Sequence, residues 1–194
     1  MNKSITINKS RQTKETNIVL QLTVNSASPQ VNIETGLPFF DHMLDQLASH
    51  GGWDLSLKMQ ADTKVDDHHG IEDVAICLGQ ALYEVWQSQS NKRYGQRLLP
   101  MDESLTLVAV DLCSRGYSVT HLPFSMERLG GISTEMWEHF FYTFAINAQM
   151  NLHIRNQYFN NNHHLIEGAF KGVAYALKEA LTPTEQSTTT KGVL

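Results

Sequence analysis

The chain has 194 residues, a formal net charge of −5 and a hydrophobic content of 41%, which suits one large folded domain with a real core. The negative charge argues against a nucleic-acid partner or an anionic membrane, and no apolar run approaches the ~20 residues of a membrane span. The N-terminus lacks the apolar core of a signal peptide, so we expect a cytoplasmic location. Cys77 and Cys113 lie in apolar strings without a Cys-x-x-Cys pattern, which predicts two buried free thiols.

Apolar periodicity predicts the elements of the first half of the chain. In chain order they are strands at 4–9, 16–24 and 31–33, a helix at 39–49, a strand from 55 toward 65, and a helix that ends near residue 86. Polar turns at 11–15 and 25–29 separate the first three strands. The last helix begins after Asp66 or Asp67, because an aspartate carboxylate accepts hydrogen bonds from free helix amides.

The second half repeats this order. Its predicted elements are strands at 105–111 and 117–122, a helix at 134–148, an extended segment at 152–154, and a helix at 161–181. Glu103-Ser104 precedes its first strand as Glu15-Thr16 precedes a strand of the first half, and the polar stretch 87–96 is a candidate seam between the halves.

Strands joined by tight turns, with helices collected afterwards, predict an α+β fold. We expect duplicated half-domains, about 4–90 and 96–182, each an antiparallel or mixed sheet with helices on one face, packed together as a pseudo-twofold sandwich. The whole chain, 1–194, is treated as a single domain with a C-terminal tail at 183–194, because neither half has an obvious core of its own.

A histidine motif is duplicated with the halves. Residues 67–72 read Asp-His-His-Gly-Ile-Glu, and residues 162–167 read Asn-His-His-Leu-Ile-Glu. Each copy also has an upstream histidine next to an acid, His42 at 26 residues before His68 and His139 at 24 residues before His163. Surface histidines have no reason to follow a duplication, so the repeat favours a metal site over scattered surface residues.

Helical spacing explains how the motif could bind metal. His68 and Glu72 are four residues apart, His164 and Glu167 three, so each pair shares a helix face. Adjacent histidines point about 100° apart and could serve two ions. Imidazole with carboxylate suits Mn, Fe, Co, Ni or Zn, and the lack of thiolates argues against structural zinc. The eight predicted ligands, enough for two ions with open positions, are His42, His68, His69, Glu72, His139, His163, His164 and Glu167.

Acidic and basic neighbours complete the expected site. Asp66, Asp67 and Asp73 are candidate helix caps or partners that orient the imidazoles. Lys171 lies four residues after Glu167, where a cation would suit a phosphate whose far end reaches the metals. Taken alone, a lysine or arginine of this kind is more often a solvated surface residue than part of a binding site.

Several motifs in one order resemble the imidazoleglycerol-phosphate dehydratase family. They are the stretches 13–16, 35–44, 66–73, 100–103, 152–155 and 162–171. The resemblance implies loss of water from D-erythro-imidazole-glycerol phosphate, giving imidazole-acetol phosphate in L-histidine biosynthesis. It also implies two Mn2+ per active site on the same eight ligands, and a 24-subunit shell of trimers with active sites between subunits.

The resemblance further implies a set of substrate contacts. They fall on Glu15, supplied by a neighbouring subunit, and on Arg93, Arg115, Lys171 and Lys191, with the Thr189 and Thr190 hydroxyls kept for phosphate. Two single residues depart from the family pattern: Gly70, beside the ligands, stands where threonine is usual, and Ala61 replaces a frequent glycine. Lys191 in the tail and Arg115 in the loop at 114–116 are retained, although the residues beside them differ from the family pattern.

The resulting hypothesis names Glu15, Glu72 and Glu167 as catalytic residues. A metal-bound imidazolate intermediate would push electrons toward the leaving hydroxyl. Glu15 is the expected general base, because it is a carboxylate outside the ligand set. The alternatives are a dimetal phosphoester hydrolase, which would use the same metals and cations, and a metal-storage or assembly protein that uses the histidines only to join subunits.

Overall fold

The structure is a computed structural model that describes residues 4–185. The first half contains β1 (Ile5–Gln12), β2 (Thr16–Val24), β3 (Val31–Glu34), α1 (Pro38–Gly51), β4 (Asp54–Ala61) and α2 (His68–Gln87). The second half contains β5 (Tyr94–Met101), β6 (Ser104–Leu112), β7 (Tyr117–His121), β8 (Arg128–Leu129), β9 (Ile132–Ser133), α3 (Glu135–Asn147), β10 (Met150–Tyr158) and α4 (Asn162–Ala180). Among these elements no helix has the length and apolar character needed to cross a membrane.

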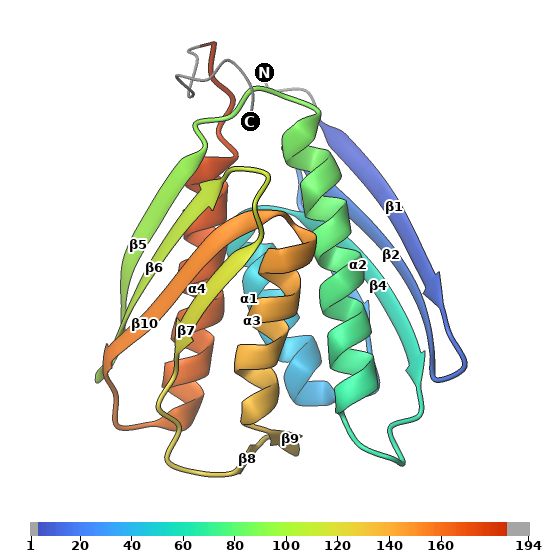
Figure 1. Cartoon of the computed structure of the whole chain (residues 1–194), viewed down its shortest axis with the longest axis vertical. Helices are drawn as coiled ribbons and strands as arrows, with labels where there is room; N and C mark the ends of the chain where they lie inside the picture. Colours follow the sequence, from blue (N-terminus) through green and yellow to red (C-terminus); the bar gives the residue numbers. More distant parts are fainter. Residues whose placement is uncertain (1–3, 186–194) are drawn as a thin grey trace.

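Two four-stranded sheets enclose a layer of four helices (Figure 1). The strand orders are β1-β2-β4-β3 and β5-β6-β10-β7, so the two sheets have the same topology. In each sheet the three long strands pair antiparallel with their neighbours. The short strand, β3 or β7, pairs parallel at one edge. The predicted α+β sandwich of duplicated halves is therefore confirmed.

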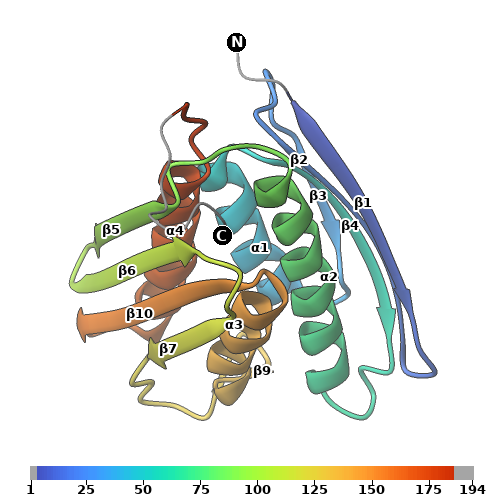
Figure 2. The ribbon, with the colours of Figure 1, turned by 45° about the horizontal axis from the view of Figure 1, so that its top comes forward.

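The helices pack across the duplication. α2 lies on β1 and β2 and contacts α3 of the second half, while α4 lies on β5 and β6 and contacts α1 of the first half. Figure 2 shows the four helices side by side between the two sheets. Each half thus buries its apolar surface against the other, so one core serves both, with the rings of Trp137, Phe140 and Phe170 in contact at its centre.

One glycine shows how closely the layers approach. A Cβ on Gly95 of β5 would lie 1.9 Å from the carbonyl oxygen of Ala176 in α4, so only glycine fits where this strand crosses the helix. The edge position of β5 also accommodates Pro100, which has no amide to donate to a further strand.

Several sequence predictions need correction. β5 and the β8-β9 hairpin were not predicted from the sequence. In β5, exposed and buried residues do not alternate at the centre of the strand, and β8 and β9 have only two residues each. The strand expected from 55 toward 65 ends at Ala61, and β1 extends through Gln12 into the segment expected as a turn. The polar seam is also packed: the Lys92 and Arg93 amides donate to the Thr182 and Ala180 carbonyls at the end of α4.

Candidate metal centre

The two copies of the histidine motif form the first turns of α2 and α4. The carboxylate of Asp66 accepts a hydrogen bond from the His68 amide at 2.9 Å, and the Asn161 side chain accepts one from the His163 amide at 2.8 Å. These side chains fix where each helix begins, and hence where its histidines point. Asp67 is the N-cap residue of α2, but its side chain does not cap the helix. Its carboxylate instead accepts from the Ser133 amide at 2.8 Å and lies 3.4 Å from the Arg128 guanidinium.

The first group of ligands, here called the Glu72 cluster, consists of His68, Glu72 and His139. Their ligand atoms lie within 4.8 Å of one another. The Nε2 atom of His139 is 3.1 Å from Oε1 of Glu72, and the rings of His68 and His139 have centroids 4.8 Å apart. Two imidazoles and one carboxylate thus converge at a half-exposed surface.

The second group, here called the Glu167 cluster, consists of His42, His163 and Glu167, again within 4.8 Å. Oε2 of Glu167 lies 2.7 Å from Nε2 of His163 and 3.5 Å from Nε2 of His42. The other oxygen, Oε1, lies 2.6 Å from the Lys171 ammonium. Burial raises the pKa of Glu167, but the hydrogen bonds from Lys171 and His163 outweigh it, so this pKa lies below its ordinary value.

Each cluster is built from both halves of the chain. His42 on α1 belongs to the first half but joins His163 and Glu167 of the second, because α1 packs on α4. His139 on α3 belongs to the second half but joins Glu72 of the first, because α3 packs on α2. The upstream histidines are therefore exchanged between the halves.

His69 and His164 lie outside both clusters. Nδ1 of His69 is 3.1 Å from the Asp62 carboxylate, and Nδ1 of His164 is 3.0 Å from the Glu103 carboxylate. The bond to Asp62 raises the pKa of His69. Bonds from its own backbone amide and from His164 lower the pKa of Glu103. Because a carboxylate occupies Nδ1, Nε2 is the nitrogen left to bind an ion. A metal-binding histidine usually donates its other ring N–H to such a carboxylate.

Two sequence predictions about these histidines need correction. Pairing of His164 with Glu167 is wrong, since Glu167 pairs with His163 four residues earlier. The acids that orient imidazoles are Asp62 and Glu103, which were missed, rather than Asp73, whose carboxylate bonds to Arg11 and Thr16. Glu103 had a signal, because it occupies the place of Glu15 in the duplicated strand pair; Asp62 had none.

Glu15 and Glu103 occupy matching hairpin turns but have different surroundings. Glu103 is hydrogen bonded to His164. Glu15 lies 3.8 Å from Nδ1 of His69, beyond hydrogen-bond length, because Asp62 already occupies that nitrogen, and the Glu15 side chain is 54% exposed. The structure thus leaves one of the twin glutamates available to a ligand.

The predicted phosphate-binding cations are not gathered in one place. Lys171 lies beside the Glu167 cluster, in an ion pair with Glu167. The amide of Arg93 bonds to Ala180, 13 residues beyond Glu167, so Arg93 lies about 20 Å away along α4, and its guanidinium bonds to Asp111 at 2.6 Å. Arg115 follows β6 at the same end. Thr189, Thr190 and Lys191 fall outside the described residues.

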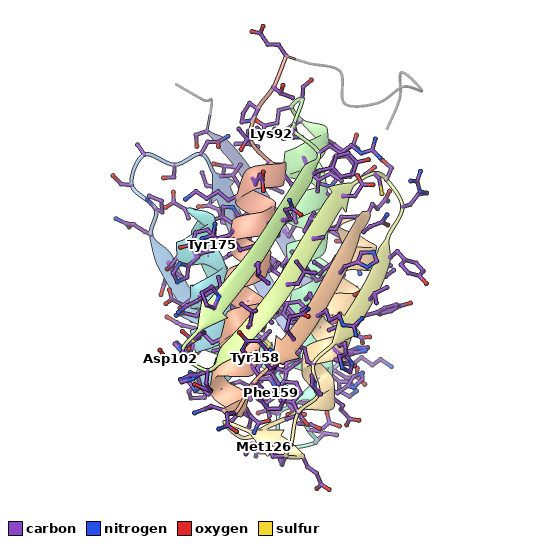
Figure 3. The ribbon with its side chains drawn as sticks, turned by 90° about the vertical axis from the view of Figure 1, so that its left-hand side faces the viewer. Lys92, Asp102, Met126, Tyr158, Phe159 and Tyr175 are labelled. Atoms are coloured by element: carbon purple, nitrogen blue, oxygen red, sulfur yellow. The ribbon has the colours of Figure 1, made fainter. Side chains whose placement is uncertain are left out.

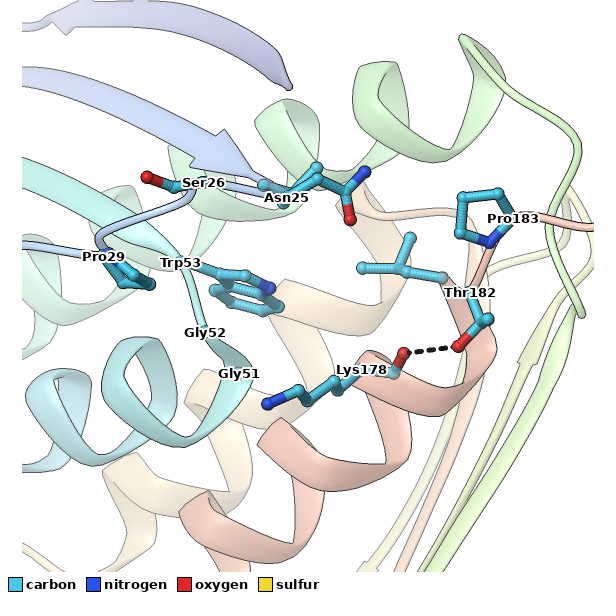
Figure 4. A pocket seen from close by; sticks show the side chains of 11 residues that line it. Asn25, Ser26, Pro29, Gly51, Gly52, Trp53, Lys178, Thr182 and Pro183 are labelled. Carbon is cyan, nitrogen blue, oxygen red and sulfur yellow. Dashed lines mark hydrogen bonds between the residues drawn. The ribbon is translucent and has the colours of Figure 1, made fainter. Parts of the chain in front are cut away.

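A pocket of about 330 Å³ lies at this far end as well. Figure 4 shows it between the turn after β2 and the ends of α1 and α4, with Trp53 and Lys178 beside it. None of the eight predicted ligands lines it. The candidate metal centre therefore lies outside this pocket.

The donors present fit divalent manganese and similar ions. Each cluster offers two imidazoles and one carboxylate within a span close to that of ligands around one ion, and thiolates are absent from both. Three donors leave coordination positions open. His69 and His164, hydrogen bonded to Asp62 and Glu103, are further donors of the same kind.

Comparison with known proteins gives a consistent result. Residues 35–177 match the family model described as imidazoleglycerol-phosphate dehydratase. Proteins of that name from Desulforamulus reducens and Lachnoclostridium phytofermentans are 43% and 45% identical, covering 95% of both chains in the first case, and 88% of this chain and 87% of the relative in the second. The crystal structure of the Staphylococcus aureus dehydratase has a TM-score of 0.84 at 36% identity and covers 93% of this chain and 100% of that one. A Pyrococcus furiosus structure in complex with (S)-C348 has the same TM-score at 32% identity and covers 96% and 100%.

Proposed function

This chain belongs to the imidazoleglycerol-phosphate dehydratase family, hydro-lyases of histidine biosynthesis, and from this premise we propose how its residues carry out the dehydration. The observation that supports the proposal best is the pair of three-ligand clusters, each joining residues of both halves. Two Mn2+ ions are proposed for each active site. When bound, they supply Lewis acidity that favours loss of the ring N–H of the substrate, the basis of the imidazolate route inferred from the sequence.

The chain's own residues divide the remaining work. Glu72 and Glu167 supply carboxylate ligands within their clusters, and Glu15 is the proposed general base that accepts the carbon-bound proton. Loss of that proton and of hydroxide from the neighbouring carbon together amount to one water, and the resulting enol converts to the ketone. The exposure of Glu15, compared with the bound state of its twin Glu103, supports this assignment.

Residues distant in one chain are proposed to act together in an assembly. The Glu72 and Glu167 clusters have three ligands each, and His69 and His164 belong to neither. Arg93 and Arg115 lie at the opposite end of the chain from Lys171. We therefore assign the fourth ligand of each cluster to a neighbouring copy in the 24-subunit shell of trimers that the resemblance implies. The remaining phosphate contacts, the Thr189 and Thr190 hydroxyls and the Lys191 ammonium among them, are assigned to neighbouring copies as well.

The outer faces of the two sheets support self-assembly. Figure 3 looks onto the outer face of the second sheet, with Lys92 and Asp102 at its two ends. This face exposes apolar side chains in neighbouring strands, including Leu98 paired with Leu107, 56% and 40% exposed. The matching face of the first sheet is polar apart from Val19, which occupies the place of Leu107. An apolar surface on one copy of a duplication indicates a contact surface.

The catalytic proposal is tested by Glu15→Gln. This variant should keep its bound metal and its sedimentation but lose turnover to the ketone product, because the amide does not accept the proton. Glu34→Gln is the matched control, since Glu34 is exposed beside Lys58 on the outer face of the first sheet. Normal turnover by Glu15→Gln would refute the assignment of the base. Phosphate release without ketone would instead favour the phosphoester hydrolase.

The assembly proposal is tested by Leu107→Asp against Val19→Asp. A charge in the apolar face of the second sheet should reduce the sedimentation coefficient of the protein, because the carboxylate must lose its water when copies associate. The same charge at Val19, the equivalent place in the first sheet, should leave sedimentation unchanged. Equal effects of the two substitutions would contradict a special role for the second sheet.

A further inference from the structure

The duplication makes the two clusters a matched pair, so their differences can be isolated. Each has a histidine, a glutamate four residues later and an upstream histidine from the other half. The next residue on the same helix face, four positions beyond the glutamate, differs: it is Ile76 after Glu72 and Lys171 after Glu167. One cluster therefore has an apolar neighbour where the other has an ammonium group.

The two glutamates differ accordingly in their bonding. Both oxygens of Glu167 are engaged, Oε1 with Lys171 and Oε2 with His163, and its side chain is 9% exposed. Glu72 uses Oε1 for His139, and its side chain is 37% exposed. Among residues 4–185, Oε2 of Glu72 has no hydrogen-bond or ion-pair partner. An incoming cation thus meets an unshared carboxylate oxygen in one cluster and an ion pair in the other.

The acids near the two clusters largely correspond: Glu15 and Asp62 lie beside His69 as Asp102 and Glu103 lie beside His164. Asp41 precedes His42 and accepts from the Thr35 amide, and Glu138 precedes His139 and accepts from the Leu122 amide, so each upstream histidine has a similar acid beside it. The additional acids on α2, Asp67 and Asp73, are each paired with an arginine. With neutral imidazoles the Glu72 cluster keeps one negative charge, whereas Lys171 cancels that of the Glu167 cluster.

We propose that the two clusters bind divalent ions with unequal affinity, that the Glu72 cluster fills first, and that Lys171 is the residue that sets the difference. An ammonium group competes with the ion for Oε1 of Glu167 and repels it at short range. Filling the Glu167 cluster then separates Lys171 from Glu167 and makes its ammonium available to an anionic group of the substrate. This inference rests on the proposed metal-dependent function and adds the order of loading.

The test is a manganese titration of the full-length protein after chelation, in which electron paramagnetic resonance reports the Mn2+ that stays in solution. The wild type should show two classes of site per chain whose dissociation constants differ at least tenfold, about 1.4 kcal/mol. His68→Asn should remove the tighter class and His163→Asn the weaker one. This readout does not depend on turnover.

Exchange of the differing residues provides the decisive comparison. Lys171→Ile makes the second cluster resemble the first and should tighten the weaker class by at least tenfold. Ile76→Lys places an ammonium beside Glu72 and should weaken the tighter class by a similar factor. Lys178→Ile is the control, because Lys178 lies two turns farther along α4 beside the far pocket and should change neither class.

The possible results distinguish the unequal loading of the two clusters from the metal-dependent function on which it rests. Two equal classes in the wild type, or a weaker class unchanged in Lys171→Ile, would overturn unequal loading while leaving the dehydratase proposal intact. Binding of less than one Mn2+ per chain would instead overturn the metal-dependent function itself. If Lys171→Ile does not fold, as judged by circular dichroism, Ile76→Lys still decides, because an unchanged tighter class in that variant contradicts the role given to the ammonium.

Discussion

A threonine at position 70 should destabilise this protein unless Ala61 is replaced by glycine at the same time. The family resemblance implies a threonine at position 70 and a glycine at position 61, and the structure brings these two positions together. A Cβ on Gly70 would lie 2.8 Å from Cε of Met59, 2.9 Å from its Sδ and 3.3 Å from Cβ of Ala61. The threonine usual at position 70 therefore needs the space that a glycine at position 61 would leave.

The size of the effect follows from these contacts. Overpacking of this kind costs about 1–3 kcal/mol. The gain from replacing a helical glycine is only a few tenths, roughly 0.3 kcal/mol for threonine. Met59 presents the flexible end of its side chain and can move, so we expect Gly70→Thr to cost about 1–2 kcal/mol. For a chain of this length such a cost lowers the melting temperature by about 2–8 °C.

Thermal unfolding of four proteins, the wild type, both single variants and the double variant, measures the coupling. Ala61→Gly alone should also lower the melting temperature, because glycine weakens a strand end. The double variant should be more stable than the sum of the single effects by about 1 kcal/mol. Gly168→Ala is the control, since a Cβ there meets nothing closer than 3.6 Å. Strictly additive effects would refute the idea that Gly70 and Ala61 compensate each other.

Two further predictions concern the histidine partners and the buried thiols. Asp62→Asn and Glu103→Gln should each weaken Mn2+ binding by about 10–100-fold, because they release Nδ1 of His69 and His164. Asp62→Asn should also lower the raised pKa of His69 in a proton NMR titration. The pKa should fall because the Asp62 carboxylate favours the charged imidazole, so the wild-type ring keeps its proton to higher pH. An unchanged His69 titration in the variant would contradict the bond to Asp62. Burial raises the pKa of the Cys77 thiol to about 11, so at pH 8 this thiol should react with a thiol reagent only after unfolding; rapid reaction in the folded protein would exclude that burial.

Sequence reasoning predicted which histidines and glutamates gather in the candidate metal centre, because they follow two strong regularities, helical spacing and duplication. Glu72 and Glu167 stand four residues after His68 and His163, and these pairs share a cluster in the structure. The assignment of His164 to Glu167 was wrong because adjacent residues point to different sides of a helix, and spacing alone does not say which of two histidines faces the glutamate. The two free cysteines are buried as predicted.

Residues held by a turn or a strand end were harder to predict. Asp62 follows β4 directly and Glu103 lies in the turn between β5 and β6, and each reaches a histidine on a helix. Such contacts depend on how a sheet is placed against a helix, which no local periodicity encodes. The same holds for β5, whose polar centre around Gln96 and Arg97 does not alternate, although its pairing with β6 and its contact with α4 are extensive.

The exchange of the upstream histidines ties function to the duplicated fold. His42 reaches Glu167 because α1 packs on α4, and His139 reaches Glu72 because α3 packs on α2. A half chain folded alone would have a helix with His-His-x-x-Glu and an upstream histidine on a different helix. It would have neither cluster, because each cluster needs one helix from each half. Two identical halves associated about a twofold axis would form two equal clusters, each with the same residue four positions beyond its glutamate. Lys171 and Ile76 break that equality, and fusion of the halves into one chain is what allows one cluster to carry a cation and the other to lack it.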